Sequence, residues 1–369
     1  MLKLFPLLSS LLFVYGTPPP VINISAWIRN VDVNSREWTI TAELVDNALS
    51  SDGLFLAVGH DIAESTFNSA ISAAYNLFSA NRESLNDVEM KGGNSSMRGY
   101  IGYGKESGLQ QFFEPKEGYS FGYDWKSPST FTNKLQGYNV WPDGLDTAVK
   151  STLLGMFSHS AFIAEAIVTN LAVYYEKVTR SSMSIVVNGG DTISIMRLFH
   201  YFSEQAAIER PTGRTPIGSS PHTDWGLLTV ITQELNTTGL QVRHADADGS
   251  FFWQDVSPLK GSVVINGGDL LSLLSKGRYA SPVHRVLCPV DEKDRMSYVF
   301  FYYPNYDTQL DLGDVCAAGE AVSGEGEGGR HNTLTRIRNK ANHASAKDGG
   351  NIRFGDYILL KWEEVFRGE

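Results

Sequence analysis

Cysteine is scarce in this sequence, and a surplus of positive charge is absent. The 369 residues include two cysteines, Cys288 and Cys316, and neither belongs to a Cys-x-x-Cys pair. Two cysteines cannot form a disulfide framework or a cysteine-based zinc site, so any metal here would use histidine and carboxylate ligands. The formal net charge is −10. Because no basic cluster is present to neutralise phosphates, we expect no nucleic-acid partner.

Long apolar runs are scarce as well. The run from Leu4 to Tyr15 is far shorter than the roughly 20 residues that cross a bilayer, so we expect no stable membrane span. Lys3 precedes this run, and small or permissive residues precede Thr17, as at signal peptidase sites. Residues 1–16 are therefore predicted to be a leader into the secretory pathway or an organelle reached through it. The alternative is a cytoplasmic protein with an apolar N-terminal arm.

The sequence does contain enough apolar side chain for a large core, since 42% of its residues are hydrophobic. Residues 17–150 mix the periodicities of helix and strand. The predicted elements are a strand within 18–28, a helix around 43–49, a strand at 53–62 and an amphipathic helix at 63–85. A longer amphipathic helix at about 146–178 would back the domain.

Residues 98–141 differ from their surroundings in being rich in glycine, aromatics and charge. The segment has too little aliphatic periodicity for a core element and too many aromatics for a free linker. It is predicted to be a structured loop over a surface. Residues 98–125 are interpreted as a lid over a substrate, with packing of the loop on itself as the alternative.

Strand-length runs rich in valine, isoleucine, phenylalanine and tyrosine follow the long helix. They cover residues 192–202, 223–233, 238–256, 261–275, 284–290 and 295–304. This pattern predicts a β core, a jelly roll or barrel, within residues 151–316 of a single α+β domain. Residues 317–350, rich in glycine and charge, are predicted to be a mobile insertion, and residues 351–369 to contain a C-terminal helix.

Two histidine-x-aspartate motifs occur in this β region: His222 with Asp224, and His244 with Asp246. Iron(II) with open positions is typically bound by two histidines and one carboxylate. Positions two apart on a strand point to the same side, so either pair could reach one ion. The context separates them, because His244 runs into a hairpin turn whereas His222 and Asp224 lead into an apolar strand. We therefore predict the first pair as metal ligands.

His284 is the best placed of the eight histidines to complete such a site. It lies in a late strand pattern with Val286 on its own face and Arg285 on the other. The other histidines lie in the long helix pattern, in another strand, at the end of an early strand or in the predicted insertion. A histidine satisfied within the core is the alternative interpretation of His284.

Arg295 and Ser297 share one face of the last strand pattern. An arginine that points into a barrel would be an uncompensated buried charge unless an anion met it. A guanidinium binds a carboxylate in bidentate fashion, and a serine hydroxyl beside it can donate one more bond. The pair therefore predicts a site for a short dicarboxylate whose other end chelates the metal. A structural carboxylate, Asp291 or Glu292, is the alternative partner of Arg295.

The stretches HTDWGLLTV, NGGDLLSLLSKGRYASPVHRV and RMSYVFFYYP resemble the iron(II) and 2-oxoglutarate dependent dioxygenases of the isopenicillin N synthase-like superfamily. PPPVINIS, RGYIGYGKES and FGDYILLKWEEVF extend the resemblance over nearly all of the chain that follows the predicted leader. The resemblance implies a double-stranded β-helix, or jelly-roll, fold with flanking helices, including the long backing helix.

The resemblance also implies roles for particular residues. The implied iron ligands are His222, Asp224 and His284, and the implied 2-oxoglutarate residues are Arg295, Ser297 and Tyr201. Phe199 and Phe202 stand where the family commonly has an asparagine and a proline beside the tyrosine. Phe199 and Phe301 are candidates for a substrate wall, and plain core packing is the alternative for Phe301.

The implied activity is an Fe(II)- and 2-oxoglutarate-dependent dioxygenase. Such an enzyme uses O2 to hydroxylate or desaturate a small organic substrate and releases succinate and CO2. Halogenation is disfavoured, because related halogenases have a small residue in place of Asp224. Two alternatives stay open: an oxidase of the same superfamily that does without 2-oxoglutarate, and a non-catalytic binding protein on the same fold. No motif encodes a particular substrate or an oligomeric state.

Overall fold

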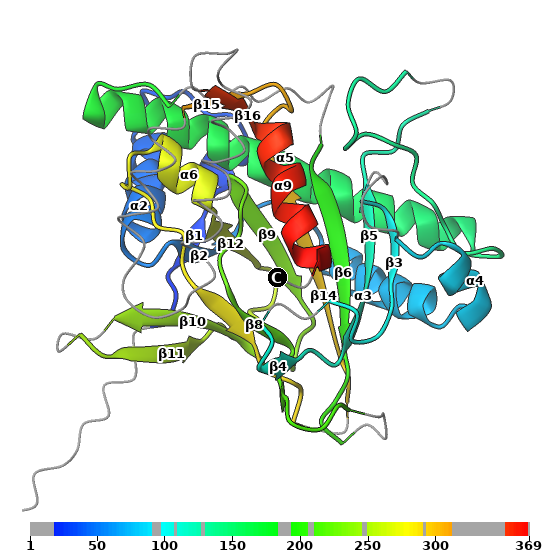
Figure 1. Cartoon of the computed structure of the whole chain (residues 1–369). Helices are drawn as coiled ribbons and strands as arrows, with labels where there is room; N and C mark the ends of the chain where they lie inside the picture. Colours follow the sequence, from blue (N-terminus) through cyan, green and yellow to red (C-terminus); the bar gives the residue numbers. More distant parts are fainter. Residues whose placement is uncertain are drawn as a thin grey trace, which may run out of the picture.

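Two β-sheets face each other at the centre of the protein, and the longest helix runs behind the larger sheet (Figure 1). The computed structural model describes residues 18–90, 97–106, 109–126, 130–183, 193–205, 210–245, 249–290, 293–311 and 351–367. The predicted leader at 1–16 and the predicted insertion at 317–350 lie outside the described residues.

The larger sheet has eight strands. In sheet order they are β1 (Val21–Asn23), β2 (Leu54–Val58), β12 (Val263–Gly267), β9 (Leu228–Gln233), β14 (Arg295–Tyr302), β6 (Ile195–Tyr201), β5 (Lys116–Gly122) and β3 (Gly99–Ile101). β1 and β2 are parallel, and all other neighbours are antiparallel. Antiparallel neighbours place directly opposed side chains on the same face, which fixes what each strand presents to the interior.

The smaller sheet has four antiparallel strands and closes the other side of the core. They are β11 (Phe251–Asp255), β10 (Leu240–Ala245), β13 (His284–Val286) and β8 (Ser219–His222). Apolar side chains from both sheets meet in one buried cluster that includes Leu56, Ile231 and Val264 from the larger sheet and Val242 and Val286 from the smaller. This arrangement is the predicted jelly roll, and it confirms an α+β domain with a mainly β core.

Alternation along β14 separates two environments. Met296 and Phe300 point outward into the core beneath the helices. Arg295 and Ser297, on either side of Met296 in the sequence, are each 1% exposed and point between the two sheets. A strand buried on both faces would normally be apolar throughout, so the polar residues on its inner face mark a place where that interior binds something polar.

α5 (Thr147–Thr179) is the predicted long helix. The carboxylate of Asp146 accepts a hydrogen bond of 2.7 Å from the backbone N–H of Ala148 and caps its first turn. Arg180, in the left-handed region at φ 61°, ends it. By length and composition α5 could also cross a membrane. In the protein its apolar residues pack against β9 and β14 of the sheet.

The remaining helices are short or of medium length. They are α1 (Ser25–Ile28), α2 (Arg36–Ser51), α3 (Glu64–Phe78), α4 (Arg82–Asp87), α6 (Asp269–Leu274) and α9 (Phe354–Arg367). The single helix predicted at 63–85 is divided into α3 and α4, because Asn81 leaves the helical path and its side chain caps α4. The run at 261–275, predicted as strand, holds β12 followed by α6.

The prediction that residues 98–141 form only a loop is wrong in part. β3 and β5 extend the larger sheet at its edge, and β4 (Phe112–Phe113) pairs with β7 (Thr215–Pro216). Tyr119 and Phe121 alternate with Gly118 and Ser120 along β5, and all four are buried. The sequence pattern did not reveal β5, because its apolar side is formed by aromatic rather than aliphatic residues and glycine lies between them. A last small pair joins β15 (Gln309–Asp311) to β16 (Asn351–Arg353).

Candidate metal centre and cosubstrate site

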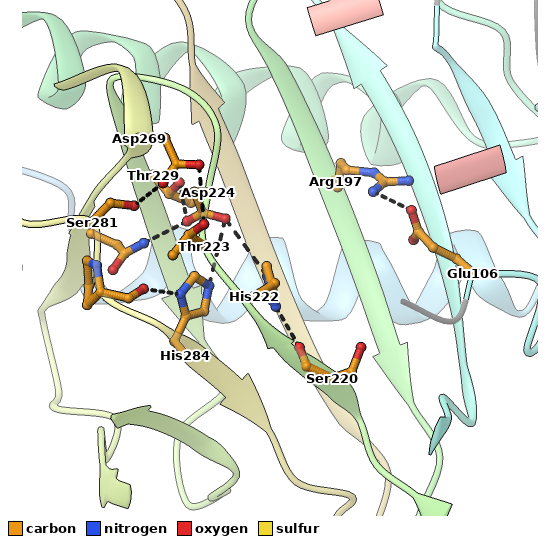
Figure 2. Close-up of polar contacts among 12 residues, drawn as sticks. Glu106, Arg197, Ser220, His222, Thr223, Asp224, Thr229, Asp269, Ser281 and His284 are labelled. Carbon is orange, nitrogen blue, oxygen red and sulfur yellow. Dashed lines mark hydrogen bonds and ion pairs between the residues drawn. The ribbon is translucent and has the colours of Figure 1, made fainter. Parts of the chain in front are cut away.

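His222, Asp224 and His284 converge at one end of the smaller sheet (Figure 2). His222 ends β8, His284 begins β13, and the two are register partners. The Oδ1 atom of Asp224 is 3.9 Å from Nε2 of His222 and 3.7 Å from Nε2 of His284. One ligand atom from each residue lies within 4.8 Å of the others. The structure therefore brings the three predicted ligands together.

The expectation that His222 and Asp224 share one strand is wrong. β8 ends at His222, and Asp224 lies in the connection to β9. The chain passes close to another backbone there, since a Cβ on Gly226 would lie 2.8 Å from the carbonyl oxygen of Tyr302. The aspartate thus reaches the site from a turn, while the histidine reaches it from a strand end.

Backbone carbonyls orient both imidazoles. Nδ1 of His222 lies 2.7 Å from the carbonyl oxygen of Ser220, and Nδ1 of His284 lies 3.1 Å from that of Pro282. An Nδ1–H that donates to a carbonyl leaves Nε2 with its lone pair, as metal-binding histidines require. Partial burial and the neighbouring His284 ring lower the pKa of His222 to about 4. The ring is therefore neutral, the form that binds a metal.

The second carboxylate oxygen of Asp224 is held by two donors. Its Oδ2 accepts hydrogen bonds from the Thr229 hydroxyl at 2.6 Å and from the Asn266 amide at 2.7 Å. Asp224 is 4% exposed. With Oδ2 occupied, Oδ1 is the atom turned toward the two Nε2 atoms. Sequence reasoning missed Asn266, although a polar residue inside the apolar run VVING was a signal.

A buried ion pair anchors the strand that carries His222. Glu114, just before β5, accepts hydrogen bonds from the backbone N–H of Ser220, at 2.8 Å, and from its hydroxyl. Nζ of Lys116 donates to the other oxygen of Glu114 at 2.5 Å. Burial alone would raise the pKa of Glu114, but Lys116 and Ser220 outweigh it and lower that pKa. A fixed negative charge thus ties β8 to the larger sheet.

Arg295 and Ser297 form the second part of the site. Nη2 of Arg295 donates to Gln233 on β9 at 3.0 Å, and the guanidinium lies over the Tyr201 ring at 5.0 Å. Nε and Nη1 of Arg295 and the hydroxyl of Ser297 are buried and have no hydrogen-bond partner among the described residues. Burial lowers the pKa of Arg295, yet a guanidinium stays charged.

These orphaned groups fit a carboxylate that comes from outside the chain. The free N–H groups of Arg295 and the hydroxyl of Ser297 are donors that carboxylate oxygens can accept from, and each buried donor left unpaired costs about 1–3 kcal/mol. Gln233, which contacts Arg295, and Thr229, which contacts Asp224, lie on the same face of β9. The arginine and the candidate ligands therefore lie along one inner wall. Asp291 and Glu292, the alternative partners of Arg295, lie outside the described residues.

The other predicted residues lie around this wall. Tyr201 pairs with Arg295 across β6 and β14, and Phe199 pairs with Ser297. Phe301 pairs with Thr229 and is partly buried. All three lie on the inner face, as candidates for cosubstrate or substrate contact should. His244 lies apart from the metal ligands: its Nδ1 is 3.6 Å from Asp52.

Comparison with known proteins agrees with this geometry. A family model described as the 2OG-Fe(II) oxygenase superfamily matches residues 192–304, which contain all three candidate ligands and Arg295. A second, the N-terminal region of a non-haem dioxygenase in morphine synthesis, matches residues 19–144. The chain belongs to the 2OG-Fe(II) oxygenase superfamily. Iron(II), 2-oxoglutarate and O2 are the cofactor and cosubstrates of this oxygenase family.

Several relatives of this oxygenase are named as hydroxylases or dioxygenases. A homoarginine-6-hydroxylase of Arabidopsis thaliana is 28% identical over 80% of this chain and 88% of its own length. A 2-oxoglutarate-dependent dioxygenase of Monascus ruber is 28% identical over 79% of this chain and 86% of its own. Among solved structures, a Neurospora crassa protein in complex with alpha-KG and thymine has a TM-score of 0.65 and 21% identity, covering 93% and 96% of the two chains.

Proposed function

We propose that His222, Asp224 and His284 bind Fe(II) in this 2-oxoglutarate-dependent dioxygenase, and that Arg295, Ser297 and Tyr201 bind the cosubstrate. The observation that carries this proposal is the set of buried, unpaired donors on Arg295 and Ser297, on the same inner wall as the three ligands. Two imidazoles and one carboxylate are the donor set of Fe(II) oxygenases and leave further positions for other ligands.

The residues around the proposed iron site would have separate roles in the reaction. The overall reaction converts a substrate C–H group, 2-oxoglutarate and O2 into C–OH, succinate and CO2, and bound Fe(II) supplies the redox chemistry. Arg295 and Ser297 would hold the carboxylate of 2-oxoglutarate that lies away from the metal. Asp224, fixed by Thr229 and Asn266, would keep one oxygen directed at the metal. The buried inner wall would exclude water from the reacting groups.

The substrate is a small molecule, and its identity is not given by the relatives. The Arabidopsis relative is named for homoarginine, whereas the Neurospora crassa protein was solved with thymine. Both names are compatible with hydroxylation of a small polar molecule by this chain.

We also propose that residues 1–16 direct the chain into the secretory pathway. N-terminal sequencing of the protein secreted from a eukaryotic host would test this. An uncleaved cytosolic protein would contradict it.

Turnover of labelled 2-oxoglutarate tests the proposed activity. Purified protein with Fe(II) and ascorbate is expected to convert it to succinate and CO2 slowly without a substrate, and faster with one. A complete absence of turnover, also with a broad panel of small molecules, would favour the 2-oxoglutarate-independent oxidase. The unpaired donors of Arg295 do not separate the two alternatives, because the carboxylate of a substrate could also accept from them.

A further inference from the structure

A second buried arginine, Arg197, lies on the inner face of β6. It follows the two-residue alternation that also places Tyr201 and Phe199 on this face. Its side chain is 5% exposed, and Nη1 donates to Oε1 of Glu106 at 2.8 Å (Figure 2). Glu106, in the connection that follows β3, is 13% exposed. The two side chains form a buried ion pair that the iron and 2-oxoglutarate roles do not use.

Three polar atoms of this ion pair have no hydrogen-bond partner in the described part of the chain. Nε and Nη2 of Arg197 have no hydrogen-bond partner there, and neither has Oε2 of Glu106. All three atoms are buried. A buried polar atom without a partner is unfavourable by about 1–3 kcal/mol, so three of them in one ion pair indicate a ligand that supplies the missing partners.

The pair lies on the side of the site that a substrate would occupy. Arg197 is opposite Val299 of β14, and Tyr201, which contacts Arg295, is four residues further along β6. That offset is about 13 Å at the rise of a strand. The two arginines therefore serve different positions along the wall. The 2-oxoglutarate held at Arg295 would not satisfy Arg197.

Aromatic contacts connect Arg197 to the metal end of the wall. Its guanidinium lies 4.8 Å from the ring centre of Trp362 on α9 and 5.3 Å from that of Phe199. Trp362 in turn contacts Trp225, the residue after Asp224, with ring centres 5.4 Å apart. Arg197 thus faces the same space as the residue beside the metal ligand, with aromatic rings on two sides.

The free atoms specify the chemistry of the ligand. The Nε and Nη2 edge of a guanidinium presents two parallel N–H groups, which match the two oxygens of a carboxylate, whereas an amide carbonyl offers only one oxygen. The free Oε2 of Glu106 accepts from a cation or an N–H group. A carboxylate alone would leave a surplus negative charge in a buried place, but a zwitterion adds one charge of each sign opposite its partner.

We propose that Arg197 and Glu106 bind the carboxylate and the ammonium group of a zwitterionic α-amino acid, the substrate of the oxygenase. The proposal rests on the proposed function, since it needs iron and 2-oxoglutarate at the positions given above. Trp362 and Phe199 would then lie beside the amino acid, and its side chain would extend toward the metal ligands.

Binding to the wild-type protein is the first test. Each of the twenty standard α-amino acids is titrated calorimetrically, without oxygen, into protein loaded with Fe(II) and 2-oxoglutarate. The best binder is then compared with its analogue lacking the amino group and with its carboxamide. Both analogues are expected to bind about tenfold or more weakly, because each loses charge-assisted hydrogen bonds. Equal binding of either analogue, or no binding across the panel, would overturn the proposal.

Two variants identify the residues. Glu106→Gln should reduce the preference for the amino acid over its deaminated analogue to about threefold or less, a change that general loss of stability would not produce. Arg197→Gln should weaken both ligands, whereas Arg243→Gln, which removes an arginine stacked on Phe251 of the hairpin, should change neither. An unchanged preference in Glu106→Gln would refute the assignment.

The outcomes separate this proposal from the function on which it rests. Wild-type protein that turns over 2-oxoglutarate but binds no member of the panel would contradict the amino-acid assignment alone. Wild-type protein that binds neither Fe(II) nor 2-oxoglutarate, measured by metal analysis and calorimetry, would contradict the oxygenase site itself.

Discussion

His222 and His244 lie near the ends of two strands of the same four-stranded sheet, and each is followed two residues later by an aspartate. β13 lies between those two strands. Its His284 pairs with His222 on one side, but with Val242 rather than His244 on the other. His244 instead stacks on Phe252 of β11, with ring centres 5.5 Å apart. The same motif thus has a second imidazole opposite it in one case and an apolar residue in the other.

The spacing of two possible ligands therefore does not define a metal site. The neighbouring strand decides, because it supplies the third side chain. On the His222 side, hydrogen bonds also hold the aspartate and the imidazole in place. Thr229 and Asn266 hold the carboxylate of Asp224, and Ser220 orients the imidazole. A short motif becomes a site where the fold brings a third ligand and the hydrogen bonds that orient all three.

Removal of one candidate ligand should produce the largest difference between the His222 motif and the His244 motif. His222→Ala and Asp224→Ala are each expected to abolish stoichiometric iron binding and 2-oxoglutarate turnover, because two remaining ligands cannot hold Fe(II) firmly. His244→Ala is the matched control, and it should retain both and change the free energy of unfolding by about 0.5 kcal/mol or less. Metal analysis of the purified proteins checks this. Equal iron loss in all three variants would contradict the assignment of His222 and Asp224 as ligands.

Arg295→Ala tests whether the metal ligands and the arginine serve different ligands. It should raise the 2-oxoglutarate concentration needed for half-maximal turnover by about 100-fold, because a buried, charge-assisted interaction is lost. Iron content measured on the same sample should stay near that of wild type. An unchanged dependence on 2-oxoglutarate, with Arg243→Ala as the control arginine, would argue for the oxidase alternative.

Asn266→Ala should have the smallest effect of the three. It removes one of two hydrogen bonds to Oδ2 of Asp224, and loss of such an orienting bond typically weakens metal affinity about 10- to 100-fold. Thr229→Val removes the other bond with little change of shape and should behave similarly. Competition with a chelator measures the affinity. Wild-type affinity in both variants would show that Asp224 needs no such support.

Local patterns could predict the candidate ligands from their setting beside apolar strands and Arg295 from the alternation of its own strand, but not that Asp224 lies in a turn after β8. Arg295 and Ser297 were recognisable as polar residues on an inner face that should be apolar. Asn266 and Thr229 were not assigned, since their role depends on β9 and β12 lying beside the turn that carries Asp224. The pair of Arg197 and Glu106 was missed for the same reason, because its residues are 91 apart in sequence. β3 and β5 were missed since glycine and aromatics obscured their period.

Trp362 has a consequence for how the enzyme is made. This α9 residue contacts both Trp225 and Arg197, and it follows His284, the last of the candidate ligands, by 78 residues. At roughly 5–20 residues per second, the ribosome adds it about 4–16 s after that ligand. During synthesis, therefore, the residues that would bind the metal exist before the wall that would receive the substrate is complete.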